Sequence, residues 1–212
     1  MTIFQKLFWF KQIGIDGFCG ETKNVFCQKS KEKPVPQKEI QRTSKSALSK
    51  TATHTLLGTG VVPAKVLCLL NAPNAMEDRT GTYLAGPEGE KTRQMLASIG
   101  LDLEKNTYLT YLSPWRPPGN RLLTAVEVSE GLEILDKCLA RVRPTYLLVL
   151  GAETVRSLIK GKTLSALRAG HCTYKDYPVY ATFSAVALMK NPNLRAQAWA
   201  DLKNFKKHLE SE

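Results

Sequence analysis

The sequence lacks several patterns that identify common classes of protein. No two of its five cysteines form a C-x-x-C pair, and the odd count argues against a complete set of disulfides. Its three histidines, His54, His171 and His208, have no metal-ligand spacing. No glycine-rich phosphate fingerprint is present, and no apolar run is long enough to cross a membrane. The sequence therefore favours reduced intracellular cysteines, no metal ion, no nucleotide cofactor and no membrane partner.

Acidic residues are also scarce relative to basic ones. The chain carries 30 Lys and Arg against 19 Asp and Glu, which gives a formal net charge of +11. An excess of cations favours polyanionic partners, nucleic acid first and an anionic membrane surface second. The alternative is that the charge only keeps the protein in solution. Part of it lies in a predicted linker, either a solvated tether or a segment that grazes DNA, so not all of the charge belongs to a binding face.

Composition predicts three segments. Apolar positions at a helical spacing predict an N-terminal helical segment over residues 1–27, which packs on the domain or, alternatively, lies transiently on a membrane surface. Lys, Ser, Thr and Gln dominate residues 28–60, which predicts a flexible basic linker. Residues 61–212 have a globular pattern and predict one α/β domain.

Strand and helix patterns alternate through that domain. Apolar runs predict four strands, at 65–70, 107–112, 146–150 and 179–183. Between and after them, amphipathic patterns predict helices at 88–99, 125–142, 152–160 and 194–209. This alternation predicts a three-layer α/β/α domain with a central, mainly parallel sheet of about four strands.

A proline-rich loop follows the second predicted strand. Residues 114–121 read PWRPPGNR, and their three prolines forbid continuation as helix or sheet. In an open α/β sheet, ligands bind beyond the carboxyl ends of the strands. Arg116 and Arg121 on a stiff loop there suit a phosphate backbone. The alternative is a structural turn with solvated arginines.

Two further loops follow the first and fourth predicted strands. In the first, Asn71 and Asn74 offer amide groups, while the Glu77-Asp78 pair is either functional or a capping or solvated pair. In the second, apolar residues stand next to a cation where polar residues are usual. Such residues either wedge into a base stack or begin a buried helical turn. The residues concerned are Val186, Leu188, Met189 and Lys190.

The order of these loops resembles the uracil-DNA glycosylase superfamily, and within it the family 4 type. The family motif GEAPGxxEDxxG corresponds to LNAPNAMEDRTG at residues 70–81. The motif RPPxNR corresponds to RPPGNR at 116–121, and TxHPAxLLRNP corresponds to TFSAVALMKNP at 182–192. The Pro-Trp that precedes the second motif and the segment 8–16 are similar to alphaproteobacterial relatives.

The resemblance also assigns roles, and this chain departs from most of them. By position, Asn71 replaces the glutamate associated with water activation, and Ser184 replaces the catalytic histidine. The predicted base pocket holds residues that differ from the family's glycine, stacking aromatic and base-reading asparagine: Asn74, Leu84 and Tyr111. The predicted DNA contacts are Arg116, Arg121, Leu188, Met189 and Lys190.

Two cysteines that hold the family's 4Fe–4S cluster fall on Trp115 and Gly131, so we predict no cluster and no other cofactor. The resemblance implies a DNA repair protein in the bacterial cytoplasm, associated with the nucleoid. It implies a monomer that binds DNA, with a repair protein as a further partner. Whether it is an enzyme stays open between a weak glycosylase that excises uracil or another lesion base, an inactive DNA- or partner-binding descendant and, third, a protein-interaction module.

Overall fold

The computed structural model describes residues 46–170 and 172–211. The predicted helical segment 1–27 and the first part of the predicted linker lie outside these residues. Within them, six strands form one sheet in the order β1-β3-β2-β4-β6-β5. The four central strands run parallel and the two edge strands pair antiparallel. The strands are β1 (Thr59–Gly60), β2 (Val66–Leu70), β3 (Thr107–Tyr111), β4 (Tyr146–Leu150), β5 (Cys172–Tyr174) and β6 (Tyr177–Thr182).

Alternation along the central strands creates two cores. In β2, Val66 and Cys68 face one layer of helices, while Leu67 and Leu69 face the other. Both faces are apolar because a parallel sheet is covered on both sides. The buried thiol of Cys68 has a raised pKa and behaves as a small apolar group.

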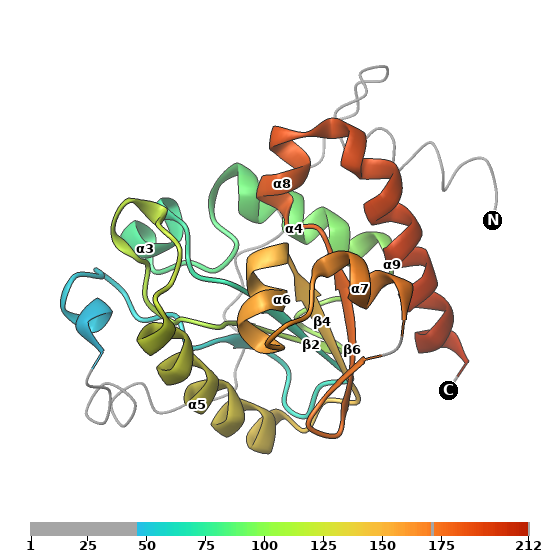
Figure 1. The fold of residues 1–212 in the computed structure, drawn as a ribbon, viewed down its shortest axis with the longest axis horizontal. Helices are drawn as coiled ribbons and strands as arrows, with labels where there is room; N and C mark the ends of the chain where they lie inside the picture. Colours follow the sequence, from blue (N-terminus) through green and yellow to red (C-terminus); the bar gives the residue numbers. More distant parts are fainter. Residues whose placement is uncertain (1–45, 171, 212) are drawn as a thin grey trace.

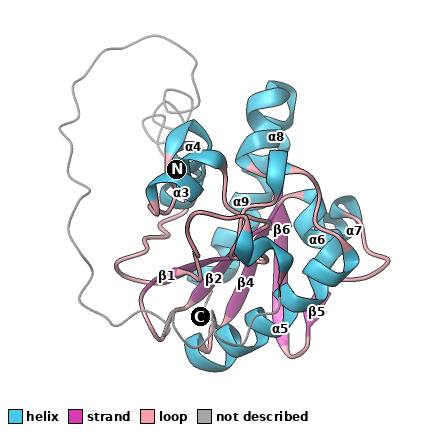
Figure 2. Ribbon diagram, turned by 90° about the vertical axis from the view of Figure 1, so that its left-hand side faces the viewer, coloured by secondary structure: helices cyan, strands magenta, loops and turns pink. Residues whose placement is uncertain are grey.

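Helices cover both faces of the sheet (Figures 1 and 2). One core contains residues of α4, α8 and α9, and the other contains residues of α5, α6 and α7. The helices are α3 (Ala75–Thr80), α4 (Gly86–Ser98), α5 (Ala125–Val142), α6 (Ala152–Leu158), α7 (Leu164–Ala169), α8 (Ala185–Lys190) and α9 (Arg195–Glu210), with 3-10 turns η1 (Ala47–Lys50), η2 (Pro118–Asn120) and η3 (Pro192–Leu194). The predicted three-layer α/β fold is confirmed.

The predicted linker extends too far. Residues 46–60 pack on the domain instead of forming a flexible tether. Leu48 of η1 and Leu56 are buried, and the backbone N–H of Leu56 donates to the Pro114 carbonyl over 2.9 Å. β1 then pairs with β3 at the edge of the sheet. The polar composition of this stretch hides the few leucines that anchor it.

Two predicted loops contain short helices. α3 lies within the loop after β2, and α8 follows β6 directly. The pattern also gave no sign of α7 or β5, which are short and partly exposed. Among the described residues, no helix has the length and apolar character needed to span a bilayer.

Candidate nucleic-acid interface

The predicted site residues meet at one edge of the sheet. Tyr111 ends β3, Asn71 follows β2, and Ser184 follows β6 by two positions. These strands are parallel, so their carboxyl ends lie on the same edge. Between β2 and β6, Gly151 follows β4, and a Cβ built there would lie 3.2 Å from the Cβ of Ser184. Open α/β sheets bind their ligands beyond this edge, and we therefore refer to it as the crevice.

The loop after β2 is held by a capping box. The side-chain oxygen of Asn74 accepts hydrogen bonds from the N–H groups of Met76 (2.8 Å) and Glu77 (2.9 Å), and the Asn74 N–H donates to Glu77 Oε2 over 2.7 Å. Asn74 Nδ2 donates to the Ala85 carbonyl over 3.0 Å. Both ends of this amide are therefore engaged within the loop. Asn74 begins a helix, as residues of its type commonly do, in place of the predicted base contact.

Glu77 joins that loop to the sheet. Its Oε1 accepts from the Leu84 N–H over 2.9 Å and from the Tyr111 hydroxyl over 2.6 Å. Burial raises the pKa of Glu77, and the hydrogen bond from Tyr111 opposes that rise. Tyr83 stacks on Tyr111, with ring centroids 6.2 Å apart and planes 16° apart. The sequence analysis left capping open as one role of the Glu77-Asp78 pair, and the structure shows that role for Glu77. The hydrogen bond to Tyr111, 34 positions away, had no signal in the sequence.

Two predicted base-pocket residues lie inside the core. Tyr111 is 1% exposed and Leu84 is 3% exposed, and both belong to one apolar cluster. Leu84 has a positive φ of 54° and presses on Gly89, where a Cβ would overlap the Leu84 backbone. Neither side chain offers a free face, so a base cannot stack on them in this conformation.

Asn71 and Ser184 remain partly exposed at the crevice. The side-chain oxygen of Asn71 is itself buried and has no hydrogen-bond partner. Ser184 is the N-cap of α8, and its hydroxyl oxygen accepts from the Ala187 N–H over 3.3 Å. The Asn71 oxygen thus lacks a partner but is closed to solvent in this conformation, whereas the oxygen of Ser184 already has a partner.

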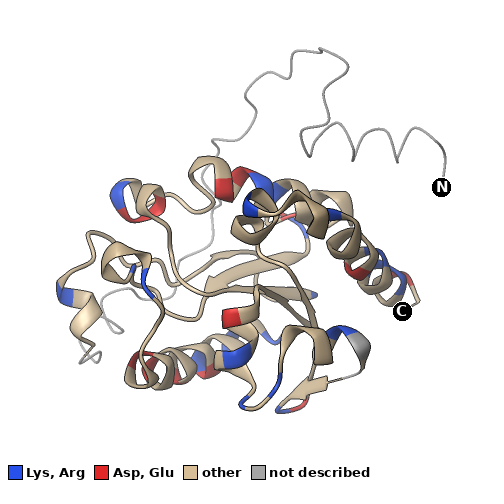
Figure 3. Cartoon of the chain, turned by 45° about the horizontal axis from the view of Figure 1, so that its top comes forward, with Lys and Arg blue, Asp and Glu red and all other residues tan. Residues whose placement is uncertain are grey.

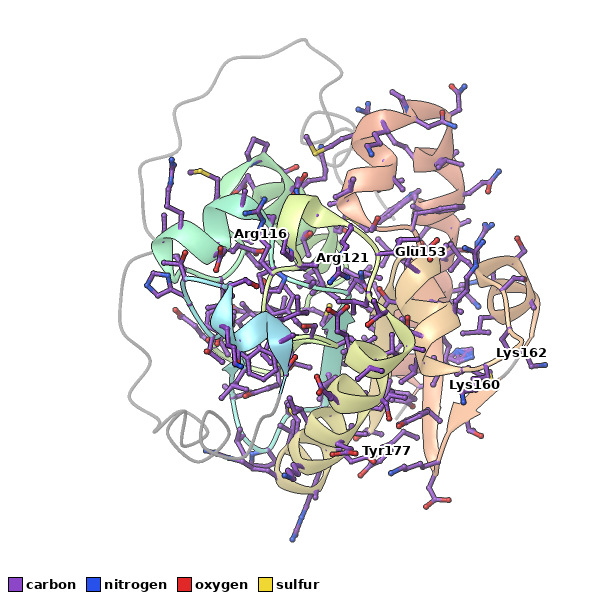
Figure 4. The ribbon with its side chains drawn as sticks, turned by 60° about the vertical axis from the view of Figure 1, so that its left-hand side comes forward. Arg116, Arg121, Glu153, Lys160, Lys162 and Tyr177 are labelled. Carbon is purple, nitrogen blue, oxygen red and sulfur yellow. The ribbon has the colours of Figure 1, made fainter. Side chains whose placement is uncertain are left out.

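The two arginines of the proline-rich loop differ in their partners (Figure 4). Arg116 Nε donates to Asn120 Oδ1 over 2.7 Å. Arg121 forms two hydrogen bonds with the Glu127 carboxylate, of 2.8 and 2.7 Å, while its side chain stays 44% exposed. The arginine lowers the pKa of Glu127 to about 2. Sequence reasoning did not find Glu127, which lies six positions from its partner.

The residues of α8 divide between core and surface. Leu188 is 1% exposed, so it cannot reach DNA in this conformation, and it fits the alternative of a buried helical turn. The segment forms a helix, and Leu188 falls on the side facing the core cluster. Met189 is 43% exposed and Lys190 is exposed, so their predicted contacts with DNA remain sterically open.

A cavity of about 410 Å³ lies elsewhere, between α7, β6 and α9. Arg168 and Asp201, which form an ion pair of 2.8 Å, are among its lining residues. None of the predicted catalytic, base-pocket or DNA-binding residues lines it. The cavity is therefore separate from the predicted site.

Comparison with known proteins identifies the family. The model of the uracil DNA glycosylase superfamily matches residues 57–203. The chain belongs to this superfamily. Glycosylase-superfamily relatives named type-4 uracil-DNA glycosylase occur in Archaeoglobus fulgidus and Sulfurisphaera tokodaii. The first is 32% identical over 79% of this chain and 88% of its own length, and the second is 26% identical over 80% and 81%. A DNA polymerase of Bacillus phage SP01 is 24% identical over 52% of this chain and 12% of its own length.

Proposed function

We propose that this superfamily member binds DNA at the carboxyl edge of its sheet in base repair and excises uracil weakly or not at all. The relatives named uracil-DNA glycosylase support a repair role. The net charge of +11 and the exposed Lys190 and Met189 beside the crevice support DNA as the partner. Arg116, which is partly exposed, adds a cation on the proline-rich loop.

The burial of Tyr111 is the main observation in support of weak uracil excision. A glycosylase must receive a base that has been flipped out of the duplex into a pocket. Here the Tyr111 ring belongs to the core, its hydroxyl donates to Glu77 over 2.6 Å, and Tyr83 stacks on it. A base could enter only if this buried group moved and broke that bond.

The two catalytic positions support the same conclusion. The free amide oxygen of Asn71 can accept a hydrogen bond from a water or a base N–H, but an amide cannot take up the proton of an attacking water. The Ser184 hydroxyl is a weaker donor than an imidazolium, and losing one donor to a developing charge costs about 3 kcal/mol. These residues position a ligand better than they catalyse.

The residues at the cluster positions do not fit a 4Fe–4S group. Trp115 is buried, and its ring N–H donates to Thr55 Oγ1 over 3.1 Å. At Gly131, a Cβ would overlap the Leu112 carbonyl oxygen, so even a cysteine would not fit without movement. We therefore propose a protein without a cluster. Iron and sulfide assays on purified protein test this, and stoichiometric amounts of both would contradict it.

The test of function pairs a cleavage assay with a binding assay on uracil-containing oligonucleotides. We expect salt-sensitive binding with slow or no release of uracil. The combined variant Asn71→Glu, Tyr111→Asn and Ser184→His should increase uracil release, because it removes the buried ring and restores an acid and an imidazole. Asn71→Gln is the matched control and should not. Excision by the wild type at the rate of an ordinary glycosylase would contradict the proposal.

The burial of Tyr111 leaves two forms of this proposal, a weak glycosylase and an inactive descendant that binds DNA or a protein partner. Binding that depends on salt, with no uracil release even from the combined variant, would select the inactive DNA-binding form. The absence of any DNA binding would leave the protein partner.

A further inference from the structure

We propose that a second phosphate-binding site lies where α4, α8 and the start of α9 meet, formed by Lys91 and Arg195 with Lys190 at its edge. This inference rests on the proposed binding of DNA and adds a contact beyond the crevice. Figure 1 shows the three helices converging, and Figure 3 shows Lys and Arg positions gathered in that part of the molecule.

The first observation is the state of Arg195. Its Nε atom is buried and has no hydrogen-bond partner, and within the described residues its guanidinium forms no ion pair. A buried donor to which nothing bonds costs stability and calls for an explanation, such as a ligand that is bound in function. An oxyanion would supply the missing acceptor.

The second observation is the charge that surrounds Lys91. Burial lowers its pKa, and so does the nearby charge of Arg195. The opposing effect of Glu90 is smaller than that of Arg195. Glu90 also pairs with Arg93 at 3.5 Å on the same helix. The charges of Lys91 and Arg195, on helices far apart in sequence, therefore disfavour each other, and an anion beside them would be favoured.

The third observation is the start of α9. This helix of 16 residues has Arg195 as its first residue, with no acidic residue in its first turn and no side-chain cap. A cation at a helix N-terminus is unfavourable because the helix dipole is positive there. An anion beside Arg195 would relieve both the dipole and the repulsion between the two side chains.

A DNA phosphate suits this position because α8 connects it to the crevice. α8 begins after Ser184 at the crevice and ends at Lys190, and its six residues span about 9 Å. At about 3.4 Å per nucleotide step along a strand, this corresponds to between two and three nucleotides. The site would therefore hold a backbone phosphate a few nucleotides from the crevice.

The test measures DNA affinity against salt for Lys91→Gln, Arg195→Gln and the wild type. The matched control is Lys207→Gln, which removes a cation from the other end of α9. We expect each of the first two substitutions to reduce the salt slope by about one unit, and the control to leave it unchanged. Two further oligonucleotides are shortened, one on the 5′ side and one on the 3′ side, to a single nucleotide beyond the uracil. With at least one of them, the variants and the wild type should have the same salt slope.

Thermal unfolding separates binding from a structural role. Arg195→Gln should unfold at the same temperature as the wild type or higher, because it removes a repulsion. Wild-type salt slope and affinity in both variants would overturn the site while leaving the proposed function standing. A second outcome would also overturn DNA as the ligand. In it, inorganic phosphate raises the unfolding temperature of the wild type but not of the variants, while all three bind DNA with the same affinity. If the wild type showed no salt-dependent binding to DNA, the proposed function itself would fail.

Discussion

Two helices of this protein begin with a capping box, but the glutamates of the two boxes have different partners. Asn74 and Glu77 cap α3, while Thr124 and Glu127 cap α5. In each box the glutamate accepts the N-cap N–H, over 2.7 Å in the first and 2.8 Å in the second. Glu77 then turns inward to a neutral phenol, whereas Glu127 turns outward to the exposed cation of Arg121.

The partners decide the electrostatics. Burial raises the pKa of Glu77, while the hydrogen bonds of Arg121 lower the pKa of Glu127 to about 2. The buried box fixes the loop after β2 against Tyr111. The box of α5, called the exposed box because its glutamate pairs with the exposed Arg121, fixes that predicted DNA contact, although Glu127 itself is only 8% exposed. The same capping box thus binds a core residue, Tyr111, at α3 and holds a surface arginine, Arg121, at α5.

The two boxes should differ most in the free energy of unfolding that is lost when each glutamate is replaced by alanine. Glu77→Ala leaves the N–H groups of Asn74 and Leu84 and the Tyr111 hydroxyl without their acceptor. Since each unpaired buried donor costs about 1–3 kcal/mol, we expect a loss of about 4 kcal/mol in the free energy of unfolding. Glu127→Ala should cost about 1 kcal/mol, the usual value of a lost cap. Denaturant unfolding measures both.

Glu133→Ala, at an exposed position of α5, is the control and should change stability little. If Glu77→Ala and Glu127→Ala lost the same free energy of unfolding, the hydrogen bonds of Glu77 to Leu84 and Tyr111 would add no stability beyond that of the cap. The two boxes would then not differ in stability.

The sequence predicted the frame of the protein better than its site. Apolar runs such as 146–150 specify buried strands because a sheet covered on both faces needs apolar residues at every position. The same reasoning could not show which way Tyr111 points, because a run that is apolar on both faces carries no alternation. Its partner Glu77 lies 34 positions away, and only the fold brings them together.

Short elements were hard to predict for a related reason: α3 was not expected, and α8 was expected only as one of two alternatives. α3 and α8 have six residues each, too few for a helical period to repeat. The caps at Asn74 and Ser184 were the available signals, and both residues had been assigned to base recognition or catalysis instead. A motif inherited from a family and a local capping signal can occupy the same residue, and here the structure shows the capping role.

The dependence of stability on pH should differ in sign between the boxes. A raised pKa in the folded state means that Glu77 contributes most below its unfolded pKa and loses that contribution as pH rises through the folded pKa. Relative to the wild type, Glu77→Gln should therefore gain stability as pH rises from about 4, the unfolded pKa, towards neutral pH. Gln can still accept a backbone N–H in a capping box.

Glu127 should behave in the opposite way. Its contribution is present above the unfolded pKa and is lost as pH falls towards about 2. Glu127→Gln should thus be less stable than the wild type near neutral pH, and the gap should close in acid. Thermal unfolding of both variants over this pH range measures the two trends. Parallel trends would mean that burial and pairing do not set these pKa values.

The smallest expected effect is a change in DNA affinity, and this prediction rests on the proposed function. In the folded protein Arg121 gives two hydrogen bonds to Glu127, so a phosphate must compete with a carboxylate for the same guanidinium. Glu127→Gln removes the competing charge and should raise the affinity for DNA and its salt slope by up to about one unit. Glu133→Gln changes the net charge equally on the same helix, so it separates release of Arg121 from a general rise in positive charge. If both variants bind equally well, Arg121 serves the fold alone, and the exposed box is as structural as the buried one.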